Sequence, residues 1–224
     1  MQKRLIRLPD KPYNRSNIIK VEKGTDYDRI IKKAGDIITH SGVVIFPAQY
    51  FYGIAVDALD IKAVQKVFNI KKRARHNPLL ALVADRGELK NLVESIPDNA
   101  KKIMEKYWPG SVTIIFRAQN HLPGLLTAGT GRIGLRMPLH PVAKALVHAA
   151  CGPVTGTSAN ISGMPACKTI DAIDSDILKN ADLVLDAGKL RSGSGSTVVD
   201  ITSSTPEIVR QGQIPGSEII ETCS

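Results

Sequence analysis

"GVVIFPAQYFYGIAV" (residues 42–56) decides how the fold is read, because it joins a buried strand to a segment rich in aromatic rings. Its apolar start, Val43–Phe46, predicts a buried strand. Four of the ten aromatic residues of the chain then fall between positions 46 and 52. Rings gathered at the end of a strand mark that end as the border of a candidate site.

Helical and strand-like patterns alternate on both sides of this stretch. Helices are expected at caps or first turns formed by Thr25, Asp60, Asp98 and Pro141, and near residues 171–180. Further strands are expected at 18–21, 79–83, 112–116, 132–138, 153–159, 182–188, 196–202 and 207–212, the last two forming a hairpin. The alternation predicts one α/β domain with helices packed on a sheet.

The composition fits a soluble globular protein with a substantial core. The chain has 224 residues, of which 43% are hydrophobic and 23% charged. Its 30 Lys and Arg residues exceed its 21 Asp and Glu residues and give a net charge of +9. That excess favours a polyanionic partner such as RNA, DNA or a phosphorylated small molecule, and a basic but unspecialised surface accounts for it equally well.

The cysteines and the hydropathy pattern point to the cytoplasm. Cys151, Cys167 and Cys223 form no C-x-x-C pair and are odd in number, which fits a reducing compartment better than a disulfide framework or a zinc site. The start of the chain lacks the apolar stretch of a signal peptide, and no run of about 18 apolar residues occurs. A cytoplasmic protein without membrane contact is expected.

Two glycine-rich stretches resemble nucleotide-binding loops only by their letters. "GTGRIG" (129–134) matches G-x-G-x-x-G but leads into a strand instead of a helix. "GSGST" (193–197) lacks the lysine of a Walker A loop, although its N–H groups and hydroxyls can meet an anion. Taken alone, both are interpreted as ordinary turns.

Four basic side chains lie near the ends of strands or helices. In "KKRARH" (71–76), Lys71 and Arg73 are either a solvated helix end or clamps for phosphate or carboxylate. Arg136 and Arg210 interrupt apolar strands, so each must find solvent, an ion-pair partner or an anion. If the four converge, they are more than the fold requires.

"VTGTSANISG" (154–163) is the most informative stretch. Ser158 and Asn160 lie among further hydroxyls at the end of a predicted strand, where an α/β sheet binds its ligands. The alternative is a turn that caps the next element. No Ser-His-Asp arrangement is visible, and the five histidines lack metal-ligand spacing, so no metal site is predicted.

Seven motifs in chain order resemble the YrdC-like family of threonylcarbamoyl-AMP synthases, from about residue 25 to 214. They are "FPAQYFYGIAVDA" (46–58), "KKRARHNPL" (71–79), "WPGSVTIIF" (108–116), "GLRMPLHPVAKAL" (134–146), "TSANISGMPA" (157–166), "STVVD" (196–200) and "IVRQG" (208–212). The resemblance implies a twisted open mixed sheet with a basic concave face. It divides the chain into an N-terminal extension and first strand (1–24), the YrdC-like domain (25–214) and a C-terminal tail (215–224), as in the short bacterial form.

The resemblance also implies the reaction. A nucleotidyltransferase of this family joins L-threonine, bicarbonate and ATP into threonylcarbamoyl-AMP and releases pyrophosphate. Mg²⁺ is expected with the ATP, held mainly by phosphate oxygens and water, and no redox cofactor is expected. A tRNA threonylcarbamoyl-transferase partner would then pass the group to an adenosine beside the tRNA anticodon.

The implied roles fall on the residues already noted. Lys71 and Arg73 would be catalytic. The ATP-binding set would be Lys71, Arg73, Asn77, Ser158, Asn160 and Arg210. The threonine-binding set would be Tyr50, Arg136 and Ser196.

The opening stretch departs from the family pattern. Where the family shows P-T-D-T-x-Y-G-L, this chain has Ala48, Gln49 and Tyr50 after the proline, and it keeps the family aromatic as Tyr52. The bulkier ring of Tyr50 would narrow the amino-acid pocket. The other interpretations are a paralogue with another amino-acid substrate and a non-catalytic protein that binds tRNA or double-stranded RNA, which would require steeply salt-dependent affinity.

Overall fold

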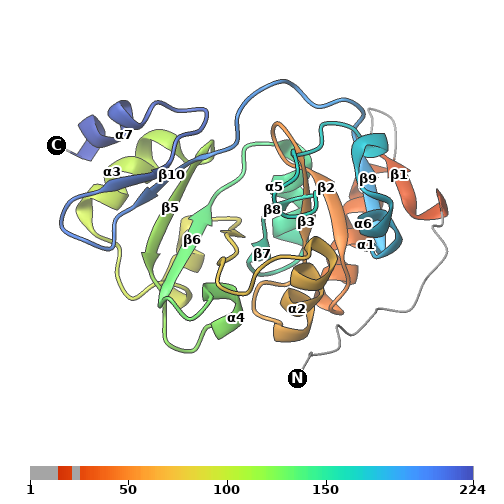
Figure 1. Ribbon diagram of the computed structural model, residues 1–224, viewed down its shortest axis with the longest axis horizontal. Helices are drawn as coiled ribbons and strands as arrows, with labels where there is room; N and C mark the ends of the chain where they lie inside the picture. Colours follow the sequence, from red (N-terminus) through yellow and green to blue (C-terminus); the bar gives the residue numbers. More distant parts are fainter. Residues whose placement is uncertain (1–14, 22–25, 224) are drawn as a thin grey trace.

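The computed structural model describes residues 15–21 and 26–223, in which eleven strands form two mixed sheets with helices packed around them (Figure 1). The predicted cap at Thr25 and most of the predicted N-terminal extension lie outside these residues. Within the described ranges, no helix has both the length and the apolar character needed to cross a bilayer.

The first sheet contains the two strands within residues 42–56. Its order is β1-β9-β2-β3-β8. The bounds are β1 Ile18–Lys20, β9 Leu183–Asp186, β2 Val44–Pro47, β3 Tyr52–Ala55 and β8 Thr157–Ser158. Strands β1, β9 and β2 run parallel, whereas β2, β3 and β8 are antiparallel neighbours, so residues 48–51 form the turn of a β2–β3 hairpin.

Two helices cover one face of this sheet. Helix α1 (Tyr27–Thr39) places Ile31, Ala34 and Ile38 on its buried face, and α5 (Pro141–Ala149) begins with proline in its first turn. Both bury apolar side chains in one cluster with β2 and β9. The helices approach closely at Gly35, where a Cβ atom would lie 2.4 Å from the backbone oxygen of Ala149.

The second sheet has the order β11-β10-β5-β6-β4-β7. The bounds are β11 Glu207–Arg210, β10 Thr197–Asp200, β5 Val112–Arg117, β6 Arg132–Arg136, β4 Ala81–Leu82 and β7 Val154–Thr155. The predicted hairpin at the end of the chain is the antiparallel pair β10–β11. The segment predicted as a tail contains helix α7 (Gly216–Cys223), which packs against α3 (Asp98–Tyr107).

The remaining helices connect and cover the two sheets. They are α2 Ile61–Lys71, α4 Gly124–Thr127 and α6 Ser175–Lys179, with 3₁₀ turns at Arg15–Asn17, Arg86–Asn91 and Ile170–Ala172. Helix α2 begins as predicted at Asp60, whose side chain accepts from the backbone N–H of Lys62 at 2.8 Å.

The predicted single sheet is divided where the chain crosses at Gly156. The strand expected at 153–159 is split there, because Thr155 pairs with β4 of the second sheet and Thr157 pairs with β3 of the first. A Cβ atom on Gly156 would lie 2.7 Å from side-chain carbons of Leu80 and Leu82. Only glycine allows the chain to pass this closely between the sheets.

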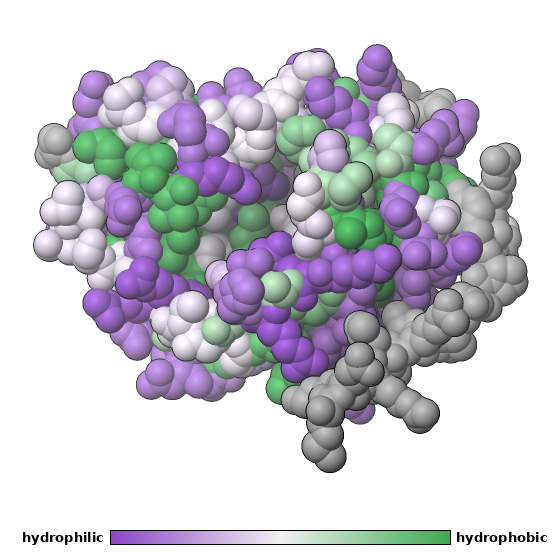
Figure 2. Space-filling view, in the orientation of Figure 1, coloured by the Kyte–Doolittle hydropathy of each residue, from purple (hydrophilic) through white to green (hydrophobic). Residues whose placement is uncertain are grey.

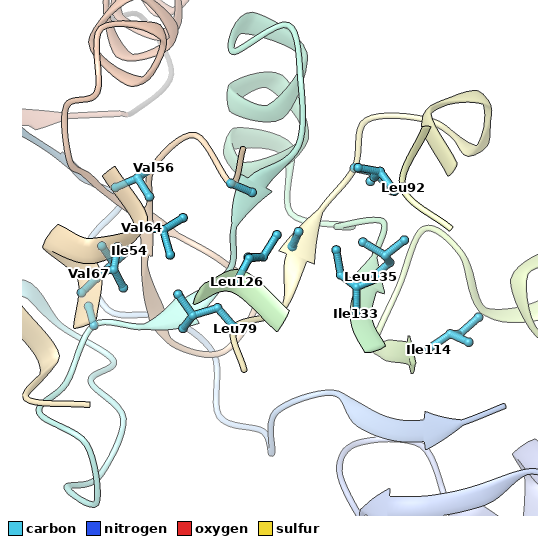
Figure 3. Packing of buried hydrophobic residues seen from close by; sticks show 14 of the residues in the cluster. Ile54, Val56, Val64, Val67, Leu79, Leu92, Ile114, Leu126, Ile133 and Leu135 are labelled. Atoms are coloured by element: carbon cyan, nitrogen blue, oxygen red, sulfur yellow. The ribbon is translucent and has the colours of Figure 1, made fainter. Parts of the chain in front are cut away.

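One hydrophobic cluster extends beneath both sheets. Figure 3 shows Leu79 and Leu126 between a group that includes Ile54 on β3 and a group that includes Ile133 and Leu135 on β6. All five side chains are buried. Because the core is continuous, it supports both sides of any site that lies between the sheets.

Candidate active site

A cavity of about 460 Å³ lies where the two sheets face each other. The first sheet contributes the β2–β3 hairpin and Ser158, and the second contributes residues of β5, β6, β10 and β11. The face seen in Figure 2 is hollowed near its centre, between the parts of the molecule that carry the two sheets. Three arginines, Arg73, Arg136 and Arg210, line the cavity, and among the described residues no Asp or Glu does.

Arg136 is the most strongly buried of these cations. Its Nε atom is buried and has no hydrogen-bond partner among the described residues. Burial, and then the neighbouring charge of Arg210, lower the pKa of Arg136 to about 10. The guanidinium remains protonated at neutral pH, so the site holds a partly buried cation that forms no ion pair with the described residues. A bound anion would supply the missing partner.

Arg210 is fixed by Ser196. Its Nη2 atom donates to the backbone oxygen of Ser196 at 2.8 Å and to the Ser196 hydroxyl at 3.1 Å. Ser196 is buried, and its Oγ lies 2.7 Å from Oγ1 of Thr113 on β5. Burial also lowers the pKa of Arg210. Strands β5 and β11 and the residue that precedes β10 thus hold a guanidinium and two hydroxyls in one hydrogen-bonded group.

Arg73 is tied to the backbone that follows helix α2. Its Nε donates to the backbone oxygen of Asn77 at 3.1 Å, and its Nη2 donates to that of Pro78 at 2.8 Å. These bonds hold the side chain along the cavity wall. The side chain of Asn77 is exposed and does not line the cavity, so Asn77 contributes here through its carbonyl.

Lys71 and Asn160 lie behind the residues that line the cavity. Lys71 is 1% exposed, and its Nζ donates to the backbone oxygen of Ser158 and, at 2.7 Å, to that of Asn160. Asn160 is also buried, and its Nδ2 donates to the backbone oxygens of Ile161 and Met164 at 3.0 and 2.5 Å. Burial lowers the pKa of Lys71 to about 7. The two residues shape the turn that presents Ser158 to the cavity.

The aromatic residues of the opening stretch divide between core and cavity. Phe46 and Tyr52 are fully buried, and Tyr50 and Phe51 are partly exposed along the cavity. The Tyr52 hydroxyl donates to the backbone oxygen of Gly188 at 2.7 Å, and desolvation raises its pKa. The four rings therefore border the cavity, and Phe46 and Tyr52 also pack in the hydrophobic core.

Six of the nine predicted site residues line the cavity, namely Tyr50, Arg73, Arg136, Ser158, Ser196 and Arg210. The other three, Lys71, Asn77 and Asn160, lie beside or behind it. Sequence reasoning gave no role to Thr113 or to Gln49, although both line the cavity. Thr113 lies in the stretch "WPGSVTIIF" (108–116), whose resemblance to the family was a usable signal, whereas nothing in the sequence marked Gln49 beyond its departure from the family pattern.

No group of three or more His, Cys, Asp or Glu side chains within residues 15–21 and 26–223 is arranged to hold a metal ion. The site is instead cationic and rich in hydroxyls, which suits an anionic ligand.

Comparison with known proteins identifies the family. Residues 36–212 match the Sua5, YciO and YrdC family, which carries the description telomere recombination. The chain belongs to this family. It is 33% identical over 189 residues to the threonylcarbamoyl-AMP synthase of Pyrococcus abyssi, covering 84% of this chain and 56% of that protein. It is 35% identical over 203 residues to the putative threonylcarbamoyl-AMP synthase of Methanocaldococcus jannaschii, covering 90% of this chain and 95% of that protein.

Solved structures of the family confirm the predicted α/β fold. The structure of P. abyssi Sua5 complexed with L-threonine has a TM-score of 0.86 and 32% identity, over 92% of this chain and 60% of that one. Escherichia coli YciO has a TM-score of 0.76 and 26% identity, over 87% and 94% of the two chains. This chain therefore spans little more than half of some relatives and nearly all of others.

Proposed function

We propose that this protein is an L-threonylcarbamoyladenylate synthase, a nucleotidyltransferase that makes threonylcarbamoyl-AMP and pyrophosphate from L-threonine, bicarbonate and ATP. The observation that carries the proposal is Arg136, whose buried Nε has no hydrogen-bond partner among the described residues, beside Arg210 in a cavity lined by none of the described acidic residues. All three substrates are anions or carry a carboxylate. The relatives named as synthases, and the threonine complex of a structural neighbour, support the same assignment.

The chemistry requires positioning and charge neutralisation and no protein nucleophile. The threonine amine attacks the carbon of bicarbonate, a C–N bond forms, and water leaves to give a carbamate. A carbamate oxygen then attacks the α-phosphorus of ATP, the α–β phosphoanhydride bond breaks, and pyrophosphate departs. Fixed cations that face the developing negative charge lower both barriers without reorganisation.

Each cation of the site receives a role in this scheme. Arg136 would bind the threonine carboxylate, because its unpartnered Nε is free to complete a charge-assisted contact. Ser196 would lie beside the same amino acid. Arg73 and Arg210 would contact phosphate oxygens, and Ser158 would lie beside the nucleotide. Lys71 would act as a positioning residue, because its Nζ donates to backbone oxygens of the 158–160 turn and the residue does not line the cavity.

Mg²⁺ would enter as part of the substrate. Among the described residues, no carboxylate lines the cavity, so the chain itself offers none of the ligands that Mg²⁺ prefers. We expect phosphate oxygens and water to hold the ion.

The product is an activated carbamoyl group, which implies an acceptor. We propose that a tRNA threonylcarbamoyl-transferase takes it over in the cytoplasm, where the three unpaired cysteines would stay reduced. Direct binding of tRNA or double-stranded RNA is a weaker candidate, supported by the net charge of +9.

Pyrophosphate release from ATP tests the proposal. The purified chain is assayed with both L-threonine and bicarbonate, with each alone and with neither. Release that requires both co-substrates is the expected result. Pyrophosphate release that does not depend on L-threonine or on bicarbonate would contradict the proposed reaction. The absence of release under every condition would contradict it as well.

A further inference from the structure

Three consecutive aromatic residues, Tyr50, Phe51 and Tyr52, contact the loop that joins β9 to β10 or a residue bonded to it. The β9–β10 loop (residues 187–196) crosses from the first sheet to the second (Figure 1) and ends at Ser196. Tyr52 holds its start, because the Tyr52 hydroxyl accepts from the backbone N–H of Ala187 at 3.0 Å. The ring of Phe51 lies 5.9 Å from Nζ of Lys168, whose backbone oxygen accepts from the N–H of Leu190 at 2.9 Å.

Tyr50 covers the middle of the β9–β10 loop. A Cβ atom on Gly193 would lie 2.3 Å from Cδ1 and 2.5 Å from Cε1 of Tyr50. The tyrosine ring therefore occupies the space that any other residue at position 193 would need. The backbone of Gly193 is not in the left-handed region. Glycine is therefore needed at this position because it has no side chain, and not because of its backbone conformation.

Gln49 fixes the outer end of the same ring. Its Nε2 donates to the Tyr50 hydroxyl at 3.2 Å, and its Oε1 accepts from the Ser111 hydroxyl at 3.1 Å. The backbone oxygen of Ser111 accepts from the N–H of Thr197 at 3.0 Å. Because Thr197 follows Ser196, this chain of contacts links the Gln49–Tyr50 pair to the strand end that carries Ser196, a residue proposed to bind the amino acid, and all three residues line the cavity.

The Gln49–Tyr50 pair also forms a wall between two cavities. A second cavity of about 450 Å³ lies on its other side, lined in addition by Leu139, His140 and Leu190. Gln49 and Tyr50 line both cavities. A smaller residue at position 50 would therefore extend the amino-acid end of the site into the second cavity.

We propose that Tyr50, seated against Gly193 and bonded by Gln49, sets the upper size limit of the amino-acid substrate and restricts it to short side chains. This inference rests on the proposed synthase function and adds a residue-level determinant of its specificity. Tyr50 acts as a barrier, and the hydroxyl only orients the ring. Packing limits of this kind discriminate substrates by about 10- to 200-fold per methylene group.

An amino-acid panel tests the barrier. Pyrophosphate release is measured with L-serine, L-threonine, L-methionine and L-leucine, each with ATP and bicarbonate. The wild type is expected to use the two short amino acids alone. Tyr50→Thr is expected to raise kcat/KM for L-methionine and L-leucine at least tenfold, whereas Tyr50→Phe, which keeps the ring, is expected to retain the limit.

A second pair of variants tests the contact with Gly193. Gly193→Ala would push the Tyr50 ring off its seat and is expected to lower kcat/KM for L-threonine at least tenfold. The double variant Gly193→Ala/Tyr50→Thr is expected to recover most of that loss, because the ring is gone. Gly152→Ala is the matched control, since a Cβ atom at Gly152 meets nothing within 4 Å. Thermal unfolding of every variant verifies that it is folded.

The outcomes distinguish a failure of the proposed role of Tyr50 from a failure of the proposed synthase function. Threonine-dependent release with an unchanged panel in Tyr50→Thr, or a loss in Gly193→Ala that the double variant does not recover, overturns the role of Tyr50 and leaves the synthase standing. Absence of release from every protein with every amino acid overturns the synthase function and this inference together.

Discussion

The Nζ atom of Lys71 donates to the backbone oxygen of Asn160 at 2.7 Å from a side chain that is 1% exposed. The resemblance to the family implied a lysine in contact with ATP. That contact stays a prediction, and among the described residues Lys71 also holds the 158–160 turn, from which Ser158 reaches the cavity. A buried amine of this kind couples the stability of the protein to pH.

Lys71→Met is expected to change the pH dependence of stability. Burial lowers the folded-state pKa of Lys71 to about 7, whereas the unfolded lysine titrates near 10.4. Between these values the unfolded state binds the extra proton, so unfolding becomes harder as pH rises. The stability of the wild type relative to Lys71→Met should increase by up to about 1.4 kcal/mol per pH unit between pH 8 and 10. Urea unfolding at three pH values measures this difference, and parallel curves would refute the depressed pKa.

Arg136→Met should separate stability from activity. The variant removes a cation whose buried Nε has no hydrogen-bond partner among the described residues, so the free energy of unfolding should rise by about 1 kcal/mol. Threonine-dependent turnover should fall ten- to a hundredfold, because a charge-assisted contact is worth roughly 1.5–3 kcal/mol. Arg117→Met, at an exposed position, is the control for stability. A variant that is both less stable and fully active would contradict the anion site at Arg136.

The alternation of helices and strands could be predicted from local patterns, because each apolar run or amphipathic face is encoded by neighbouring residues. The division into two sheets could not be. It depends on Gly156 passing between Leu80 and Leu82, a close approach between segments far apart in the sequence. The predicted single strand at 153–159 gave no sign of that contact.

The same distinction between local patterns and distant contacts explains which site residues could be predicted from the sequence. Arg136 and Arg210 were recognised because charges inside apolar strands require a partner. The burial of Lys71 was not, because helix-end lysines are usually solvated and its acceptors, two backbone oxygens, carry no sequence signature. The seat of Tyr50 on Gly193 joins residues 143 positions apart and was equally invisible.

Tyr52→Phe should loosen the start of the β9–β10 loop. The Tyr52 hydroxyl lies 2.7 Å from the backbone oxygen of Gly188 and 3.0 Å from the N–H of Ala187. Its loss leaves those groups unpaired, which should cost about 1–3 kcal/mol of stability. Amide hydrogen exchange at Ala187 should accelerate by a corresponding factor. Tyr107→Phe is the control. The Tyr107 hydroxyl makes an exposed contact with the backbone oxygen of Glu218, and its loss should hardly change amide exchange at Ala187.

Thr113→Val should affect the amino acid more than the nucleotide. Oγ1 of Thr113 lies 2.7 Å from the hydroxyl of Ser196, and both residues are buried. Valine keeps the shape and removes this bond, so the Ser196 hydroxyl keeps only its contact with Arg210 and is less well oriented. KM for L-threonine should rise about tenfold, the equivalent of roughly 1.4 kcal/mol, with KM for ATP nearly unchanged. An equal rise in both constants would indicate a general distortion of β5 and contradict a local role.

The most direct test of the central claim is the mass of the product. The chain is incubated with ATP, L-threonine and ¹³C-bicarbonate, and the nucleotide fraction is analysed by mass spectrometry. The account predicts a threonylcarbamoyl-AMP peak that carries one ¹³C atom and is absent when L-threonine is omitted. A nucleotide fraction that contains only ATP and its hydrolysis products, with no ¹³C incorporated, would contradict it.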